Sequence, residues 1–108
     1  MIPRVLTSRL QKLAQQFPVL TVLGPRQAGK TTLVRNAFPN KPYLSLENPD
    51  VQEFALSDPR AFLSRYSEGA ILDEVQRAPE LLSYLQGIVD EKKQKGLFIL
   101  TGSHNYLL

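Results

Sequence analysis

The sequence predicts an α/β fold in which parallel strands alternate with helices. Two observations carry this prediction. A glycine-rich loop, Gly24 to Thr32, follows an apolar, β-branched run and precedes a segment that can form a helix. A second apolar run, Gly69 to Leu72, ends in the adjacent carboxylates Asp73 and Glu74. This order is typical of a βαβ-style domain, whose ligands bind at the carboxyl ends of the strands.

In the first half of the chain, sequence patterns predict two helices and two strands. Helical spacing of leucines indicates a helix from Pro3 to Gln16. The run Val19 to Leu23 is typical of a buried strand, and a helix is expected over Thr32 to Phe38, after the loop. The alternation over Tyr43 to Leu46 predicts a second strand.

Over residues 50–66 we expect two short helices with polar caps. Asp50 is expected to cap a helix that runs through Leu56. Either Ser57 or Asp58 is expected to cap another, from Pro59 to about Tyr66.

In the last third of the chain, sequence patterns predict a strand, a helix and a second strand. The run that starts at Gly69 forms the first strand. An amphipathic helix follows, and Gly96 ends it. Leu97 to Leu100 forms the last strand. The apolar stripe of the helix consists of Leu81, Leu82, Leu85, Ile88 and Val89. We expect this stripe, together with Leu107 and Leu108, to need a partner surface.

The loop GPRQAGKTT fits G-x-x-x-x-G-K-[ST], a phosphate-binding motif of nucleoside triphosphatases. Successive backbone N–H groups in such a loop form an anion-binding concavity. Lys30 would contact the β- and γ-phosphates, and the Thr31 hydroxyl would bind Mg²⁺. The expected phosphate-binding residues are Gly24, Pro25, Arg26, Gln27, Ala28, Gly29, Lys30, Thr31 and Thr32.

The acidic pair supplies the opposite wall of this site. Asp73 would hold Mg²⁺ directly or through water, and Glu74 would orient and deprotonate the attacking water. A strand that merely ends in an acidic turn is the alternative, but the phosphate loop upstream favours the functional interpretation. Thr101 or Ser103, just past the last strand, would face the γ-phosphate and that water. The lone His104 is left out of the site.

Composition limits the other possibilities. The chain has 108 residues with 43% hydrophobic and 21% charged residues, which suits one modest globular domain. It has no cysteine and no apolar run long enough for a bilayer, so we expect a cytoplasmic protein without a membrane partner. The net charge of +3 gives only weak support for a nucleic-acid partner.

Four segments together resemble one family: GPRQAGKTTL, YLSLENPDVQEFALSDPRAFL, ILDEVQRAPELLSYLQ and FILTGSHNYLL. They are similar to the prokaryotic AAA-type ATPase domains that precede a C-terminal domain of unknown function. The resemblance implies a three-layer P-loop core, in which the strand after the acidic pair inserts between that pair's strand and the loop strand. It also implies ATP as the nucleotide.

By position, the resemblance assigns roles to individual residues. Lys30 and Thr31 match the phosphate and magnesium residues, Asp73 and Glu74 match the acidic pair, and residues 101–103 match the sensor segment. Gln76 lies in the recurrent DEVQ run and receives no role.

Members of that family continue with a fifth strand, a helical lid and a C-terminal domain, where arginine fingers normally lie. We therefore expect a partial domain over residues 1–108, with an N-terminal helix at 3–17 and a nucleotide-binding core at 18–108. Without a fifth strand, Val19 to Leu23 becomes an edge that self-association, strand exchange or the N-terminal helix would cover. The alternatives to an ATPase are a nucleotide-binding oligomerisation or regulatory module without turnover and a nucleic-acid-associated ATPase.

Overall fold

The structure is a computed structural model and describes residues 4–25 and 29–103. Its elements alternate along the chain as expected for an α/β domain. In chain order they are α1 (Arg4–Ala14), β1 (Val19–Leu23), α2 (Lys30–Ala37), β2 (Tyr43–Ser45), α3 (Pro49–Ser57), α4 (Pro59–Ser64), β3 (Ala70–Asp73), the 3₁₀ turn η1 (Val75–Arg77), α5 (Leu81–Lys92) and β4 (Phe98–Gly102).

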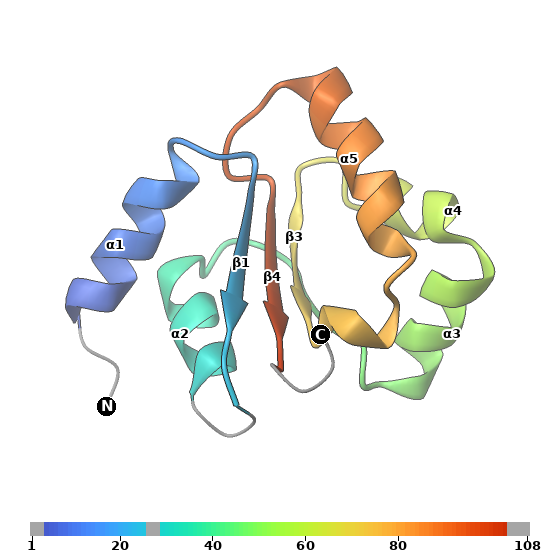
Figure 1. Cartoon of the computed structure of the whole chain (residues 1–108), viewed down its shortest axis with the longest axis horizontal. Helices are drawn as coiled ribbons and strands as arrows, with labels where there is room; N and C mark the ends of the chain where they lie inside the picture. Colours follow the sequence, from blue (N-terminus) through green and yellow to red (C-terminus); the bar gives the residue numbers. More distant parts are fainter. Residues whose placement is uncertain (1–3, 26–28, 104–108) are drawn as a thin grey trace.

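The four described strands form one parallel sheet in the order β1-β4-β3-β2 (Figure 1). The last strand, β4, lies between β1 and β3, so the predicted insertion is confirmed. Leu23 is level with Gly102, and Ser45 is level with Asp73. Because all strands run the same way, the segments that follow them meet at one edge of the sheet.

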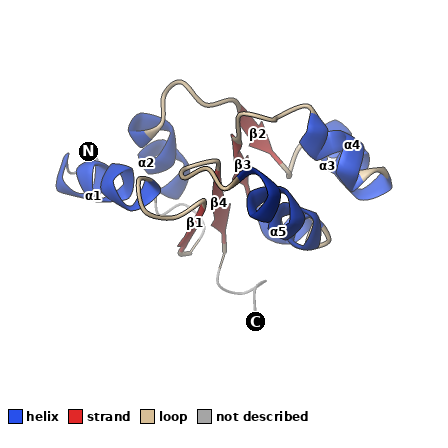
Figure 2. Cartoon of the chain, turned by 90° about the horizontal axis from the view of Figure 1, so that it is seen from above, coloured by secondary structure: helices blue, strands red, loops and turns tan. Residues whose placement is uncertain are grey.

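Helices cover both faces of the sheet, which gives three layers (Figure 2). Successive side chains of a strand point to opposite faces, so β3 and β4 contribute to two cores. Ile71 and Ile99 pack with Val34 of α2. Leu72 and Leu100 belong to the larger core on the other face, which α3, α4 and α5 complete. The predicted three-layer architecture is therefore correct.

Several predicted element ends are wrong by a few residues. Asn48, not Asp50, caps α3, and its side-chain oxygen accepts from the amide of Asp50 at 2.9 Å. The capping residue precedes Pro49 because proline suits the first helical position. Of the two proposed caps for α4, Asp58 is correct, and it accepts from the Ala61 amide at 3.1 Å. The α5 helix ends before Lys93, which has a φ of 57°, rather than at Gly96.

The expectation that the α5 stripe needs a partner is wrong for most of its residues. Leu81, Leu85 and Val89 are buried in the larger core of this chain, and Ile88 packs against it. Leu82 alone of the five is exposed, at 43%. Leu107 and Leu108 lie outside the described residues.

The outer strand β1 is partly covered by the N-terminal helix. Leu10 and Leu13 of α1 pack against the smaller core, which contains Leu20 of β1. Thr21 and Leu23 remain exposed. Among the described helices, none has the length and apolar character needed to cross a bilayer.

Candidate functional site

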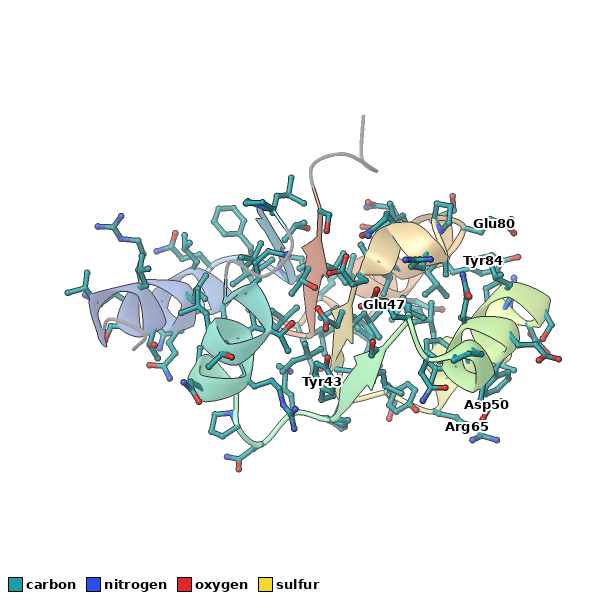
Figure 3. All side chains as sticks on the ribbon, turned by 90° about the horizontal axis from the view of Figure 1, so that it is seen from below. Tyr43, Glu47, Asp50, Arg65, Glu80 and Tyr84 are labelled. Carbon is teal, nitrogen blue, oxygen red and sulfur yellow. The ribbon has the colours of Figure 1, made fainter. Side chains whose placement is uncertain are left out.

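A cleft of about 330 Å³ opens at the carboxyl edge of the sheet. Its walls come from the start of α2 and from the ends of β2 and β3. Figure 3 looks onto this edge, with Tyr43 and Glu47 labelled near its middle. The described residues that line the cleft are Gly29, Lys30, Thr31, Thr32, Glu47, Asp73 and Glu74.

Two glycines shape the loop that enters α2. Gly29 caps the helix with a φ of 83°, a conformation in which a side chain would be strained. The Gly24 amide donates to the Gly102 carbonyl at 3.2 Å, which ties the loop to the end of β4. A Cβ at Gly24 would lie 3.4 Å from the Lys30 side chain, so the lysine packs directly on this backbone. Arg26, Gln27 and Ala28, also expected to bind phosphate, lie outside the described residues.

The start of α2 presents backbone N–H groups to the cleft. The first amides of a helix have no intrahelical acceptor, and the helix dipole adds partial positive charge there. These are the amides of Lys30, Thr31 and Thr32. An anion placed at this end of α2 is therefore stabilised before any side chain contributes.

Lys30 is a buried cation, with 7% of its surface exposed. Its ammonium donates to the Pro25 carbonyl at 3.2 Å and lies 3.9 Å from Glu74 Oε2. A buried charge requires compensation. The Pro25 carbonyl and the nearby Glu74 carboxylate provide this compensation.

Asp73 accepts hydrogen bonds from three hydroxyl groups. Thr31 Oγ1 lies 3.2 Å and 3.0 Å from the two carboxylate oxygens. The Thr101 hydroxyl donates to Oδ1, and the Tyr43 hydroxyl donates to Oδ2. Three different segments thus orient one buried carboxylate.

Tyr43 is held at its hydroxyl group and at one face of its ring. Burial, followed by the hydrogen bond to Asp73, raises the pKa of Tyr43 to about 12. The Arg35 guanidinium lies over the ring, 4.3 Å from its centre. Such cation–π contact favours a single ring position.

Glu74 sits on a strained turn. Its φ of 57° and ψ of 53° are left-handed, which is uncommon for a residue with a side chain. Its amide donates to Thr101 Oγ1 at 3.0 Å, and η1 follows immediately. Its Oε1 accepts from Ser103 Oγ at 3.1 Å and from Gln76 Nε2 at 2.6 Å. The turn therefore holds the carboxylate at the cleft with 6% of the residue's surface exposed.

The structure brings the predicted site residues together. Lys30, Thr31, Asp73 and Glu74 line one cleft. The two residues that the sequence left as alternatives donate to different carboxylates: Thr101 to that of Asp73, and Ser103 to that of Glu74. His104 lies outside the described residues.

Tyr43 and Glu47 were not predicted from the sequence as site residues, and Gln76 was noted there without a role. Tyr43 begins the short strand β2, and Glu47 follows its end, which is level with the end of β3. Recognising that strand end as a neighbour of Asp73 would have pointed to both. Gln76 is near Glu74 in sequence, but only the sharp turn at Glu74 brings their side chains together.

The oxygens of Thr31 and Asp73 suit Mg²⁺. Among the described residues, no group of three His, Cys, Asp or Glu side chains could hold a metal. Mg²⁺ does not need one, since it takes one or two protein oxygens and completes its octahedron with water and phosphate. Thr31 Oγ1 and Asp73 Oδ2 are 3.0 Å apart. Adjacent ligands on an octahedron with bonds of roughly 2.1 Å have about this separation.

A larger hollow of about 770 Å³ lies beside α4 and α5, away from these residues. Its charged lining residues are Arg60, Asp90 and Glu91. None of its described lining residues belongs to the glycine-rich loop or to the acidic pair. This hollow is therefore separate from the cleft that contains the predicted site residues.

The chain matches one protein family and two longer mycobacterial proteins. Residues 16–108 match the family described as "AAA domain". The uncharacterized proteins Rv2008c of Mycobacterium tuberculosis and Mb2031c of Mycobacterium bovis are each 39% identical to this chain over 98 residues. The match covers 89% of this chain and 22% of each relative, so the chain spans about a fifth of the length of these relatives.

Proposed function

This chain belongs to the AAA domain family. We propose that its cleft binds ATP with Mg²⁺ and hydrolyses ATP to ADP and inorganic phosphate. Family membership indicates nucleotide binding and ATPase activity in general terms. The observation that supports the specific site is the convergence of one buried cation and two buried carboxylates on the same cleft. Hydrolysis by the longer proteins that contain such a chain is part of the proposal.

The start of α2 and Lys30 would bind the phosphates. The Lys30 ammonium would exchange the neutral Pro25 carbonyl, at 3.2 Å, for phosphate oxygens. Charge-assisted bonds of this kind are shorter and stronger than neutral ones. The first-turn amides of α2 would add further donors.

Thr31 and Asp73 would hold Mg²⁺, which would neutralise phosphate charge when bound. The hydroxyls of Tyr43 and Thr101 would keep the Asp73 carboxylate oriented toward the cleft. Preorganised ligands lose less freedom on binding.

Glu74 would act as the general base. A water oxygen would attack the γ-phosphorus while the bond to the β–γ bridging oxygen breaks, and Glu74 would take the proton of that water. ADP and inorganic phosphate are the products. Ser103 would help to hold the base through its bond to Oε1.

The chain alone should bind ATP better than it hydrolyses it. Phosphoryl transfer depends mainly on positioning and charge, and an arginine finger contributes roughly a thousandfold or more to the rate. The chain spans about a fifth of the length of the relatives that it matches.

Replacing Lys30 tests the binding claim. Lys30→Ala removes the ammonium, and we expect the Kd for Mg·ATP to rise about 10- to 100-fold, as for the loss of one charged hydrogen bond. Isothermal titration calorimetry gives this value. The matched control is Lys95→Ala, which removes a lysine exposed just after α5 and should leave the affinity unchanged. Equal affinities for wild type and Lys30→Ala contradict the proposed site.

Replacing Glu74 tests hydrolysis. Glu74→Gln keeps the size of the side chain but removes the base, so we expect phosphate release to fall at least about 100-fold while Mg·ATP still binds. Steady-state phosphate release measures the rate. Equal, near-zero release with and without this change, measured in a longer protein that contains the chain, would instead favour a nucleotide-binding module without turnover.

A further inference from the structure

Two side chains hold one oxygen of the Glu74 carboxylate from behind the cleft. Gln76 Nε2 donates to Glu74 Oε1 at 2.6 Å, and Ser103 Oγ donates to the same oxygen at 3.1 Å. Gln76 is not among the described residues that line the cleft. Its influence on the site therefore acts through Glu74.

The carboxylate sets the orientation of the Gln76 amide. With the amide turned over, its carbonyl oxygen would face a carboxylate oxygen at the same short distance, and two acceptors repel each other. In the observed orientation, Gln76 Oε1 is buried without a hydrogen-bond partner in the part of the chain that the structure describes. A buried unpaired acceptor is unfavourable. The bond to Glu74 is kept even though it leaves the other end of the amide unpaired.

The other carboxylate oxygen faces Lys30 without closing a hydrogen bond. Glu74 Oε2 and Lys30 Nζ are 3.9 Å apart, whereas a charge-assisted N–H···O bond spans about 2.7–2.9 Å. Opposite charges in a poorly solvated site attract strongly, so restraints must act on both. On the lysine side there is the Pro25 carbonyl, and on the glutamate side there are the two donors to Oε1.

We propose that Gln76 is a positioning residue which, with Ser103, restrains Glu74 from accepting a direct hydrogen bond from Lys30. The Lys30 ammonium then remains available to phosphate oxygens, and Glu74 stays at the cleft wall. The inference rests on the proposed nucleotide binding, since it concerns how the same lysine is kept ready for the triphosphate.

Gln76→Met tests this role by removing the donor at similar side-chain length. In this variant the distance between Lys30 Nζ and Glu74 Oε2 could shorten from 3.9 Å to that of a direct hydrogen bond. At an effective dielectric constant near 20, the stronger attraction favours the closed pair by about tenfold in its equilibrium constant. We therefore expect the Kd for Mg·ATP to rise about tenfold by the same estimate.

Thermal stability separates this role from a merely structural one. The lost hydrogen bond is offset by removal of the unpaired oxygen, so the melting temperature of Gln76→Met should stay close to that of wild type. A purely structural glutamine would give a lower melting temperature and an unchanged Kd. The matched control is Gln86→Met. Gln86 also donates to a carboxylate, Asp90 at 3.0 Å, but on the exposed surface of α5.

A double variant identifies the path of the effect. In Glu74→Gln there is no carboxylate to capture Lys30, so adding Gln76→Met should leave the Kd of Glu74→Gln unchanged. A further tenfold loss in that background, or equal Kd values for wild type and Gln76→Met, would overturn the inference while leaving nucleotide binding intact. Absence of Mg·ATP binding by the wild type would overturn both proposals.

Discussion

Asp73 shows how a buried charge can be held ready for a ligand. An isolated carboxylate would be strongly unfavourable in a buried position. Hydroxyls from α2, β2 and β4 supply the missing hydrogen bonds. Hydroxyls are neutral and can rotate, so they stabilise the charge without occupying the cleft with a competing cation.

Tyr43→Phe tests the contribution of one of these hydroxyls. The variant removes a hydrogen bond to a charged group but keeps the ring under Arg35. Because Tyr43 is only half-buried, we expect a loss of about 1–2 kcal/mol in the free energy of unfolding, measured by urea denaturation with EDTA present. No change in stability would show that the Asp73 contact contributes nothing.

The same comparison predicts a pH dependence. The pKa of Tyr43 is raised to about 12 in the folded chain, from 10.0 for the free side chain. Its stabilising effect is therefore complete below pH 10 and is lost as pH rises toward 12. The stability difference between wild type and Tyr43→Phe should narrow over this window. A difference that stays constant would contradict the assignment.

The site residues divide into those that local sequence reveals and those that it does not. Lys30 and Thr31 follow from the loop motif, and the acidic pair follows from its strand. Tyr43 was missed because its contact with Asp73 depends on how β2 and β3 pair, which no local pattern states. Gln76 was noted in the sequence but received no role, because its contact depends on the left-handed turn at Glu74.

At the scale of elements, apolar runs predicted β1, β3 and β4 within a few residues, because buried parallel strands are continuously apolar. The half-buried β2 was predicted instead from alternation. Helix ends were less predictable. At α3, several polar residues could serve as the cap, and only the position of Pro49 decides between them.

Gly69 controls how β3 begins. Its φ is 95°, and a Cβ at this position would lie 1.8 Å from the Leu97 carbonyl oxygen. The close approach lets the Ala70 amide donate to that oxygen at 3.1 Å, which starts the pairing of β3 beside β4. This glycine is therefore required by both its backbone conformation and its packing.

Gly69→Ala should lower the free energy of unfolding by about 2–4 kcal/mol, from backbone strain and overpacking. Chemical denaturation gives the value. The matched control is Gly87→Ala on α5, where a Cβ meets nothing within 4 Å. That change should raise stability by about 0.5–1 kcal/mol, as expected for a helix glycine. Equal effects of the two substitutions would contradict the role given to Gly69.

At the scale of the whole molecule, the two faces of the sheet are covered to different extents. One core is completed by α3, α4 and α5, while the other rests on α1 and α2 and is smaller. The smaller core ends at β1, an outer strand whose Thr21 and Leu23 are exposed. Exposed edge strands favour pairing with other chains.

We propose that this chain, as an isolated unit, self-associates through the β1 edge. Thr21→Lys places a charge on that strand and should convert a dimer or larger species to a monomer, as measured by size-exclusion chromatography with light scattering. The control Ser64→Lys adds the same charge on the exposed end of α4 and should not change the mass. A monodisperse wild-type monomer at high concentration would refute the proposal.

We propose that a triphosphate fits between the start of α2 and the acidic end of β3. The most direct test is a crystal structure of the chain with Mg²⁺ and a non-hydrolysable ATP analogue. We predict phosphate oxygens within hydrogen-bond distance of Lys30 Nζ and Mg²⁺ bound by Thr31 and Asp73. A triphosphate bound instead in the hollow beside Arg60 and Tyr84, with the cleft at Lys30 empty, would contradict it.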